Sequence, residues 1–279
     1  MSRPTVKSGK FSAGVDCIIG ENVTVDVAEE VVLGDRCVIG DNTYLCGRSV
    51  KIGDDFYGYS HWNKRLEVGL GRRSEEDAVL TVGSRCTFHD NKIDLARHVK
   101  IGDDVGLSPK VTIYTHGYWL SCLEGFPCVR APVAIGDGVI VGYRSTVLAG
   151  VGIPDRCVIG AGSVMTKTLT RNRSVYGGVP AKYIKPVDSV PTAWRPSILA
   201  DLLREWNESM AYRGFPPTFY VDYPTVYWTT PSGSNAVVDV DPPDCRGDED
   251  EYTDDLRWHL FCHGIRIYTK RPFKKLEKR

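Results

Sequence analysis

The chain has 279 residues, of which 42% are hydrophobic, so it can bury a substantial core and is long enough for two domains. Its 35 basic and 35 acidic residues cancel to a formal net charge of zero, which leaves no overall field to attract nucleic acid or an acidic membrane. No apolar run approaches a membrane span, and the first residues, MSRPTVKSGKF, lack the apolar core of a signal peptide, so we expect a cytoplasmic protein.

Apolar residues recur at a spacing of six from about Cys17 to about Leu169. The first half carries three interrupted groups: Leu33, Ile39 and Leu45; Val82 and Phe88; and Ile101, Leu107 and Ile113. The second half carries one unbroken series: Ile135, Val141, Val147, Ile153, Ile159 and Met165. A period of six fits neither a helix nor an alternating strand, but it is typical of a hexapeptide β-helix, in which three repeats make one triangular coil and the repeated residue points inward.

Small residues between these positions agree with a narrow interior and tight corners. We expect Gly136, Gly142, Gly160 and Gly162 to take positive φ at the corners, and Ser145, Cys157 and Ser163 to fill the interior. Of the nine cysteines, Cys37, Cys86 and Cys157 occupy equivalent repeat positions. Since the number is odd and the spacings are irregular, we interpret these three as packing thiols in a reducing compartment.

Two long stretches interrupt the repeat, residues 57–80 and residues 117–132. The first is rich in Gly, Arg and Glu, and the second carries aromatic residues and two cysteines. Loops of this length in a compact solenoid usually serve a function, so both are candidate walls of a binding site.

The repeat ends at Gly177, Gly178 and Pro180, and the sequence changes character from Asp188. We predict helices over 197–214 and 250–264, strands over 218–230, 235–240 and 265–270, and a solvated acidic turn at 248–255 before a frayed basic tail. The fold is therefore mainly β, with a β-helix over residues 1–187 and a small α+β appendage over 188–279. An open solenoid end needs a cap, which is the simplest role for the appendage.

Three segments carry a family resemblance: VTIYTHGYW at 111–119, the long repeat at 131–167, and GGVPAKYI at 177–184. Together they resemble the left-handed β-helix acyltransferases of the maltose, galactoside and nodulation O-acetyltransferase type. The resemblance covers about residues 17–187 and does not explain the appendage. It implies acetyl-CoA as acyl donor, a homotrimer, and a cofactor groove between neighbouring solenoids.

His116 is the candidate catalytic base. Acetyl transfer from a thioester to a hydroxyl or amine needs a base, and imidazole suits that task near pH 7. His116 follows Ile113 by three residues, at a corner just before the second loop, and the matching histidine of the family is its general base. We expect direct attack on acetyl-CoA, with the oxyanion held by a backbone N–H near Gly142 or Tyr143.

A metal-dependent alternative comes from the γ-class carbonic anhydrases, which share the fold and bind zinc through three histidines. Their paired histidines are missing, because no histidine follows His116 before His259. We therefore predict no catalytic metal.

The remaining site residues follow from the resemblance. On the donor side it places Gly142, Tyr143 and Ala161 along the pantetheine arm, Thr166 and Lys167 at the nucleotide end, and Lys182 at a phosphate. On the acceptor side it points to Asn91 and Asp94. In the second loop, we expect Tyr118, Trp119 and Glu124 to orient His116, to stack on a sugar, or to form an apolar lid. The first loop departs from the family pattern and adds Trp62, Arg65, Arg72 and Arg73. Its arginines suit a phosphate or carboxylate of the acceptor.

Three functions remain open at this point. The first is O-acetylation of a sugar or surface-polysaccharide unit, favoured by the histidine followed by a loop. The second is N-acetylation of a nucleotide-linked amino sugar, which requires a nucleotide pocket in the first loop or the appendage. The third is a noncatalytic β-helix scaffold, which predicts no thioester turnover.

Overall fold

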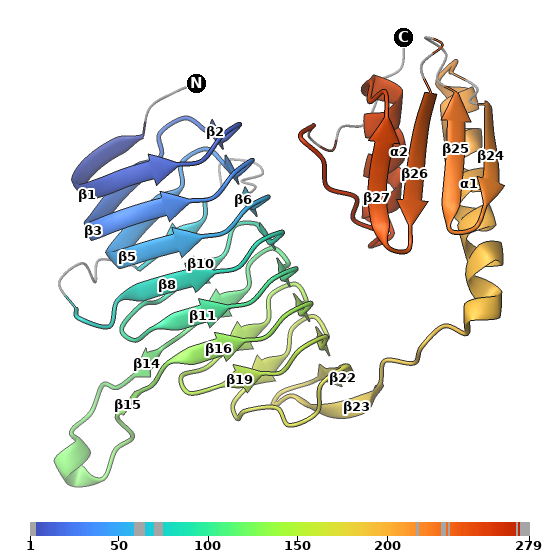
Figure 1. Ribbon diagram of the computed structural model, residues 1–279. Coiled ribbons are helices and arrows are strands. Elements are labelled where there is room, and N and C mark those ends of the chain that lie inside the picture. The colour runs from blue at the N-terminus through green and yellow to red at the C-terminus, as the bar shows by residue number, and fades with distance from the viewer. Residues whose placement is uncertain are drawn as a thin grey trace. The chain divides into compact units, whose positions relative to one another are not determined.

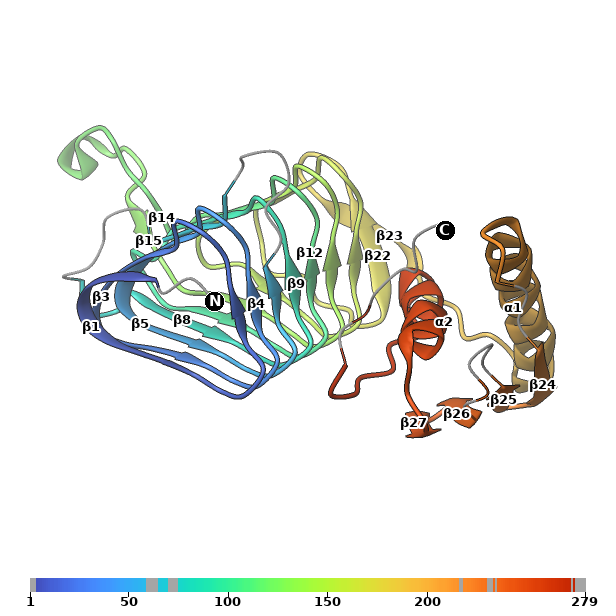
Figure 2. The same cartoon turned by 90° about the horizontal axis from the view of Figure 1, so that it is seen from above.

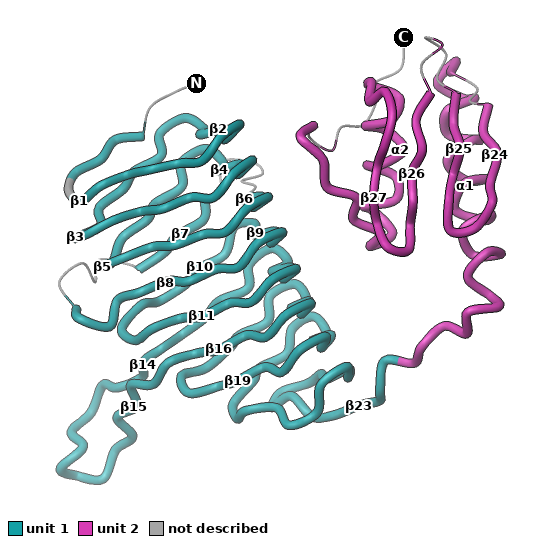
Figure 3. The backbone as a smooth tube through the Cα atoms, viewed as in Figure 1, with its two compact units in different colours: residues 1–187 teal, residues 188–279 magenta. Residues whose placement is uncertain are grey.

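The structure is a computed structural model that describes residues 4–58, 65–69, 75–215, 218–229, 233, 235–271 and 273. The chain forms two compact units, residues 1–187 and 188–279, coloured separately in Figure 3. Trp62, Arg72 and Arg73, named above for the first loop, lie outside the described residues. Within the described part, no helix is both long and apolar enough to cross a membrane.

Unit 1 is a three-sided coil of short parallel strands (Figure 1). One face is a nine-stranded sheet: β2 (Ile18–Ile19), β4 (Val38–Ile39), β6 (Tyr57–Gly58), β9 (Thr87–Phe88), β12 (Gly106–Leu107), β17 (Ile140–Val141), β20 (Val158–Ile159), β22 (Ser174–Gly177) and β23 (Lys182–Pro186). Every pairing in it is parallel except that of β22 with β23, which closes the coil.

The other two faces belong to a single twelve-stranded sheet. The first carries β7 (Glu67–Val68), β10 (Lys92–Ile93), β13 (Thr112–Ile113), β18 (Thr146–Val147) and β21 (Val164–Met165). The second carries β8 (Val79–Val82), β11 (Val99–Ile101), β16 (Val133–Ile135) and β19 (Gly152–Ile153). The long strands β1 (Thr5–Ala13), β3 (Thr24–Leu33) and β5 (Tyr44–Ile52) complete the sheet. β5 pairs with β7 through its first residues and with β8 through its last, so the faces join there.

The six-residue spacing determines this architecture. Ile135 pairs with Ile153, Val141 with Ile159 and Val147 with Met165, so three repeats make one full coil. All six of these side chains are at most 3% exposed. Apolar burial of this kind contributes roughly 1.5–3 kcal/mol for each side chain. The turned view in Figure 2 shows the strands of successive coils stacked into flat faces.

The predicted packing thiols are confirmed. Cys37, Cys86 and Cys157 are buried and free of disulfides, and each thiol donates a hydrogen bond to a carbonyl oxygen of the neighbouring coil. Burial raises the pKa of the Cys37 thiol to about 12 and also raises that of Cys157, so both stay protonated at neutral pH.

The glycines have a different role from the one predicted. Of the four expected at positive φ, only Gly162 has it, whereas charged and amide residues such as Arg36, Asn42 and Arg144 fill the left-handed positions. Gly136 and Gly142 are needed because the next coil approaches their backbone: an added Cβ would lie 2.1 Å from Asp155 Oδ1 or 2.6 Å from Ala161 N. Close approach between coils, rather than turn conformation, therefore selects glycine there.

Gly102 provides a test of this requirement. A Cβ at Gly102 would lie 2.1 Å from Asp137 Oδ1, which accepts the N–H of Asp103 at 2.8 Å, and 2.9 Å from backbone atoms of the next coil. Gly102→Ala is expected to lower the free energy of unfolding by about 1–3 kcal/mol, because two coils must separate. Gly106→Ala is the control, since nothing lies within 4 Å of its Cβ. Denaturant unfolding of both variants measures the difference, and equal stability would contradict this role for Gly102.

The first predicted loop is interrupted rather than continuous. β6 and β7 both lie within residues 57–80, and Gly58 and Val68 are buried at inward positions of the coil. The sequence pattern failed here because glycine replaces the apolar residue at position 58 and the next steps along the chain are not six. The predicted loop is thus divided by β7, and residues 59–64 and 70–74 lie outside the described residues.

Unit 2 is a four-stranded antiparallel sheet with two helices. The strands are β24 (Thr218–Asp222), β25 (Thr225–Thr229), β26 (Asn235–Val240) and β27 (Pro243–Gly247), paired in chain order. The helices are α1 (Arg195–Tyr212), preceded by the 3-10 turn η2 (Thr192–Trp194), and α2 (Glu251–Cys262). Trp206 of α1 and Leu256 of α2 share one core with Val226 and Trp228 of the sheet. Both predicted helices are present.

Two predictions for this unit are wrong. Residues 265–270 do not form a strand, because Ile267 packs into the core while its carbonyl accepts a hydrogen bond from Arg257. The acidic run is not a solvated turn either: Asp250 caps α2 by accepting the N–H groups of Tyr252 and Thr253, and Asp254 and Asp255 are at most 3% exposed. Their charges are compensated by arginines, as in the 2.6 Å pair of Arg213 with Asp255.

Candidate active site

His116 lies at one corner of the prism, where the chain leaves the coil. β14 (His116–Gly117) pairs antiparallel with β15 (Val129–Arg130), and the short 3-10 helix η1 (Cys122–Glu124) lies between them. Residues 117–132 therefore form a hairpin that leaves and returns at the same corner and projects from the prism (Figures 1 and 2). Since the N–H of Ala131 donates to the carbonyl of Thr115 at 3.0 Å, the base of the hairpin is fixed next to His116.

His116 is held by a buried carboxylate. Its Nδ1 lies 2.5 Å from Oδ2 of Asp94, which comes from the preceding coil and is only 2% exposed. Burial alone would raise the pKa of Asp94, but hydrogen bonds from Thr115 and His116 outweigh it and hold this pKa below its ordinary value. The carboxylate accepts the Nδ1 proton, so the lone pair of a neutral His116 resides on Nε2. This is the tautomer that a general base requires.

Thr115 completes the arrangement and is a residue that the sequence analysis missed. It is fully buried, and both its N–H and its hydroxyl donate to Oδ2 of Asp94, at 3.0 and 2.7 Å. Its own oxygen accepts the N–H of Arg97 at 3.1 Å. The only sequence signal for Thr115 was its position directly before His116 and the loop. In the structure both side chains contact the same oxygen of Asp94.

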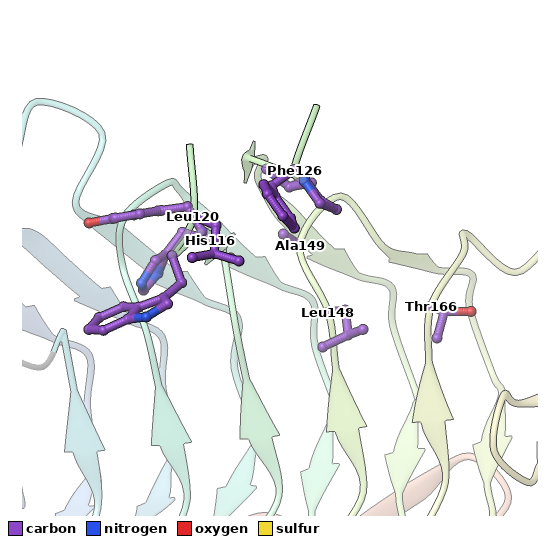
Figure 4. Close-up of a pocket in the computed structure, with 11 residues that line it drawn as sticks. His116, Leu120, Phe126, Leu148, Ala149 and Thr166 are labelled. Atoms are coloured by element: carbon purple, nitrogen blue, oxygen red, sulfur yellow. The ribbon is translucent and has the colours of Figure 1, made fainter. Parts of the chain in front are cut away.

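A cavity of about 570 Å³ adjoins His116 (Figure 4). Its walls are mainly apolar and are formed by the hairpin and by the corners of the next two coils: His116, Gly117, Tyr118, Trp119, Leu120, Phe126, Pro127, Val129, Leu148, Ala149 and Thr166. The ring centroid of Tyr118 lies 5.5 Å from that of His116 and 5.3 Å from the guanidinium carbon of Arg130. Apolar walls with one polar reactive group are typical of a small-molecule site.

Of the three residues predicted in the second loop, two line the cavity and one does not. Tyr118 and Trp119 line the cavity, although Trp119 remains 92% exposed. Glu124 lies in η1 and is not among the cavity residues, so the orienting role considered for it belongs to Asp94.

The two acceptor residues suggested by resemblance occupy different positions from those expected. Asn91 is fully buried: its Nδ2 donates to the carbonyl of Ser108 at 2.8 Å, and its Oδ1 accepts the N–H of His89 at 2.7 Å. It fixes the coil interior and cannot reach an acceptor. Asp94 lies behind His116 and orients the ring instead of meeting the acceptor. Arg65, from the first loop, pairs with Glu67 at 2.7 Å.

The residues predicted to bind the acetyl donor lie at two different corners of the prism and at its end. Thr166 and Lys167 follow β21, at the corner of His116, and Thr166 lines the cavity. Gly142, Tyr143 and Ala161 follow β17 and β20 and lie at another corner, and Lys182 begins β23 after the last coil. Tyr143 is 41% exposed, with Arg144 and Lys110 at its ring face. The N–H of Gly142 donates to the carbonyl oxygen of Ile159 at 2.8 Å, so it is not available for the oxyanion contact predicted for it.

Comparison with known proteins identifies the repeat. A family model described as the hexapeptide repeat of succinyl-transferase matches residues 12–46, 30–55 and 132–167. Unit 1 is a left-handed hexapeptide-repeat β-helix. The hexapeptide repeat explains the spacing from Leu33 to Met165, and the matched segments lie on both sides of the His116 corner.

Among curated proteins, "Putative acetyltransferase YJL218W" of Saccharomyces cerevisiae is 38% identical over 97 residues, which is 33% of this chain. The chain spans about half, 48%, of that relative. Among solved structures, a maltose O-acetyltransferase from Clostridium difficile 630 is 28% identical, with 52% of this chain and 70% of that chain covered and a TM-score of 0.31. The polysialic acid O-acetyltransferase OatWY is 20% identical, with 67% and 91% covered and a TM-score of 0.45.

Proposed function

We propose that the protein is an acetyl-CoA-dependent O-acetyltransferase that acts on a hydroxyl group of a sugar or polysaccharide unit. The observation that carries the proposal is the buried Asp94 carboxylate 2.5 Å from Nδ1 of His116, beside an apolar cavity at the hexapeptide-repeat corner. The acetyltransferase name of the yeast relative supports the reaction class.

The reaction would proceed in one addition and one elimination. Nε2 of His116 takes the proton of the acceptor hydroxyl while the hydroxyl oxygen attacks the carbonyl carbon of the thioester. The tetrahedral intermediate then collapses: the carbon–sulfur bond breaks, and the thiolate of coenzyme A takes the proton from the imidazolium. Asp94 stabilises the transient imidazolium and keeps Nε2 directed outward.

A panel of acceptors tests the proposal. Release of thiol from acetyl-CoA is measured with free sugars, oligosaccharides and nucleotide-linked amino sugars, with wild-type protein and a His116→Ala control. We expect His116-dependent turnover with a hydroxyl acceptor. Turnover only with an amino sugar would favour N-acetylation, and no turnover with any acceptor would favour a scaffold.

We also propose that the active protein is a homotrimer. Thr166 and Lys167 lie at the His116 corner, whereas Tyr143 and Ala161 lie at another, so one groove that uses both sets needs a neighbouring copy of the prism. Flat faces favour cyclic closure. The exposed apolar residues of the hairpin, among them Trp119 and Leu123, support such a contact. Light scattering is expected to give three times the 31.0 kDa mass of the chain, and a monomer would contradict the shared groove.

A further inference from the structure

Two histidines and a glutamate meet on the helical side of unit 2. Glu205 comes from α1, His259 lies in the last turn of α2, and His263 is the C-cap residue of α2. One possible ligand atom from each residue lies within 4.8 Å of the other two, and the imidazole ring centroids are 4.7 Å apart. The spacing of four residues places both rings on the same side of α2.

Hydrogen bonds fix the protonation of both rings. His259 Nε2 lies 2.9 Å from the carbonyl oxygen of Leu202, and His263 Nδ1 lies 2.9 Å from that of His259. Carbonyl oxygens only accept hydrogen bonds, so these two nitrogens carry the protons. The lone pairs are therefore on Nδ1 of His259 and Nε2 of His263. Histidines that bind metals in proteins are usually oriented in this manner, with the second ring N–H donated to a carbonyl group.

Burial and charge also suit a metal ligand set. His259 is partly buried, and burial favours the neutral form of the ring that coordinates a metal. His263 Nε2 lies 3.7 Å from Oε2 of Glu205, which is longer than a hydrogen bond. The side chains of His263 and Glu205 are 32% and 65% exposed, so an ion can enter and water can complete its coordination.

We propose that Glu205, His259 and His263 form a binding site for a divalent transition metal, zinc above all, that links α1 to α2. Two imidazoles and one carboxylate form a ligand set that zinc accepts and magnesium does not. Ligands about 2.0–2.2 Å from a tetrahedral ion lie roughly 3.3 Å from one another. The ligand atoms, now within 4.8 Å, must therefore approach by up to about 1.5 Å, through rotation of the exposed Glu205 side chain and of the part-exposed His263 ring. This inference is independent of the proposed acetyl transfer, since every residue belongs to unit 2.

Zinc titration of the full chain tests the site. Protein stripped with EDTA is titrated with ZnCl₂ by calorimetry at pH 7.5, and thermal unfolding is followed with and without zinc. We expect one zinc per chain with a micromolar or lower Kd and a higher Tm of unit 2. We further expect that His263→Ala and Glu205→Gln each weaken binding at least about tenfold, while MgCl₂ has no effect.

Two control variants make the result specific. Glu208→Gln changes another exposed glutamate of α1 and is expected to leave zinc affinity unchanged. Cys262→Ser removes the thiol next to His263 and is expected to retain zinc binding, because sulfur is not in the proposed set. Absence of zinc binding, unchanged affinity in His263→Ala, or loss of binding only in Cys262→Ser would overturn the proposal.

Discussion

Replacing His116 with alanine is expected to lower kcat for acetyl transfer about 10²–10⁴-fold, the usual contribution of a positioned general base. The KM for acetyl-CoA should change little, because the imidazole acts on the acceptor proton rather than on the bound donor. Steady-state thiol release at saturating acetyl-CoA measures both quantities.

His98→Ala is the matched control for this experiment. His98 comes from the preceding coil, bonds to Thr81 at 3.2 Å and does not line the cavity, so its loss should leave kcat within about twofold. Full activity of His116→Ala would rule out His116 as the base and would mean that another group at the cavity takes the proton.

Replacing Asp94 with asparagine is expected to lower kcat by about 10²–10⁴-fold while the fold is retained. The amide is nearly isosteric, and its oxygen takes the place of Oδ2, which accepts both donors of Thr115 and Nδ1 of His116. A neutral amide oxygen cannot stabilise the imidazolium that forms when His116 takes the proton of the acceptor, so the barrier to that step rises. Kinetic measurement together with thermal unfolding separates this effect from misfolding.

The double variant His116→Ala with Asp94→Asn gives a stricter test of the same pair. If Asp94 acts only through His116, the double variant should be no slower than His116→Ala alone, because residues that act as a unit are not additive. A kcat of Asp94→Asn close to wild type, or losses that multiply in the double variant, would contradict the positioning role of Asp94.

The spacing of six predicted the coil because it reports one physical fact, the inward direction of every sixth side chain. It could not predict where the register continues without an apolar residue, as at Gly58. There the ring of Phe56 fills the inward position, since a Cβ added at Gly58 would lie 2.9 Å from Cε1 of Phe56. The glycines were recognised, but their reason was misjudged, because contact between coils is not visible along the chain.

The site was predicted in part, for a similar reason. His116 could be identified because it stands at a corner before a long insertion. The role of Asp94 could not, because 22 residues separate the pair and only the pairing of β10 with β13 brings them together. In unit 2, the sequence likewise did not predict the arginine partners of Asp254 and Asp255 or the approach of Glu205 to His263, because these contacts form only in the folded unit.

The identity of the acetylated product tests the central claim most directly. The best acceptor of the panel is incubated with acetyl-CoA and enzyme, and the product is analysed by mass spectrometry before and after mild alkaline treatment. The account predicts the addition of one acetyl group as an ester that mild alkali removes, formed by wild-type protein and not by His116→Ala. An alkali-stable amide, or acetylation that persists in His116→Ala, would contradict it.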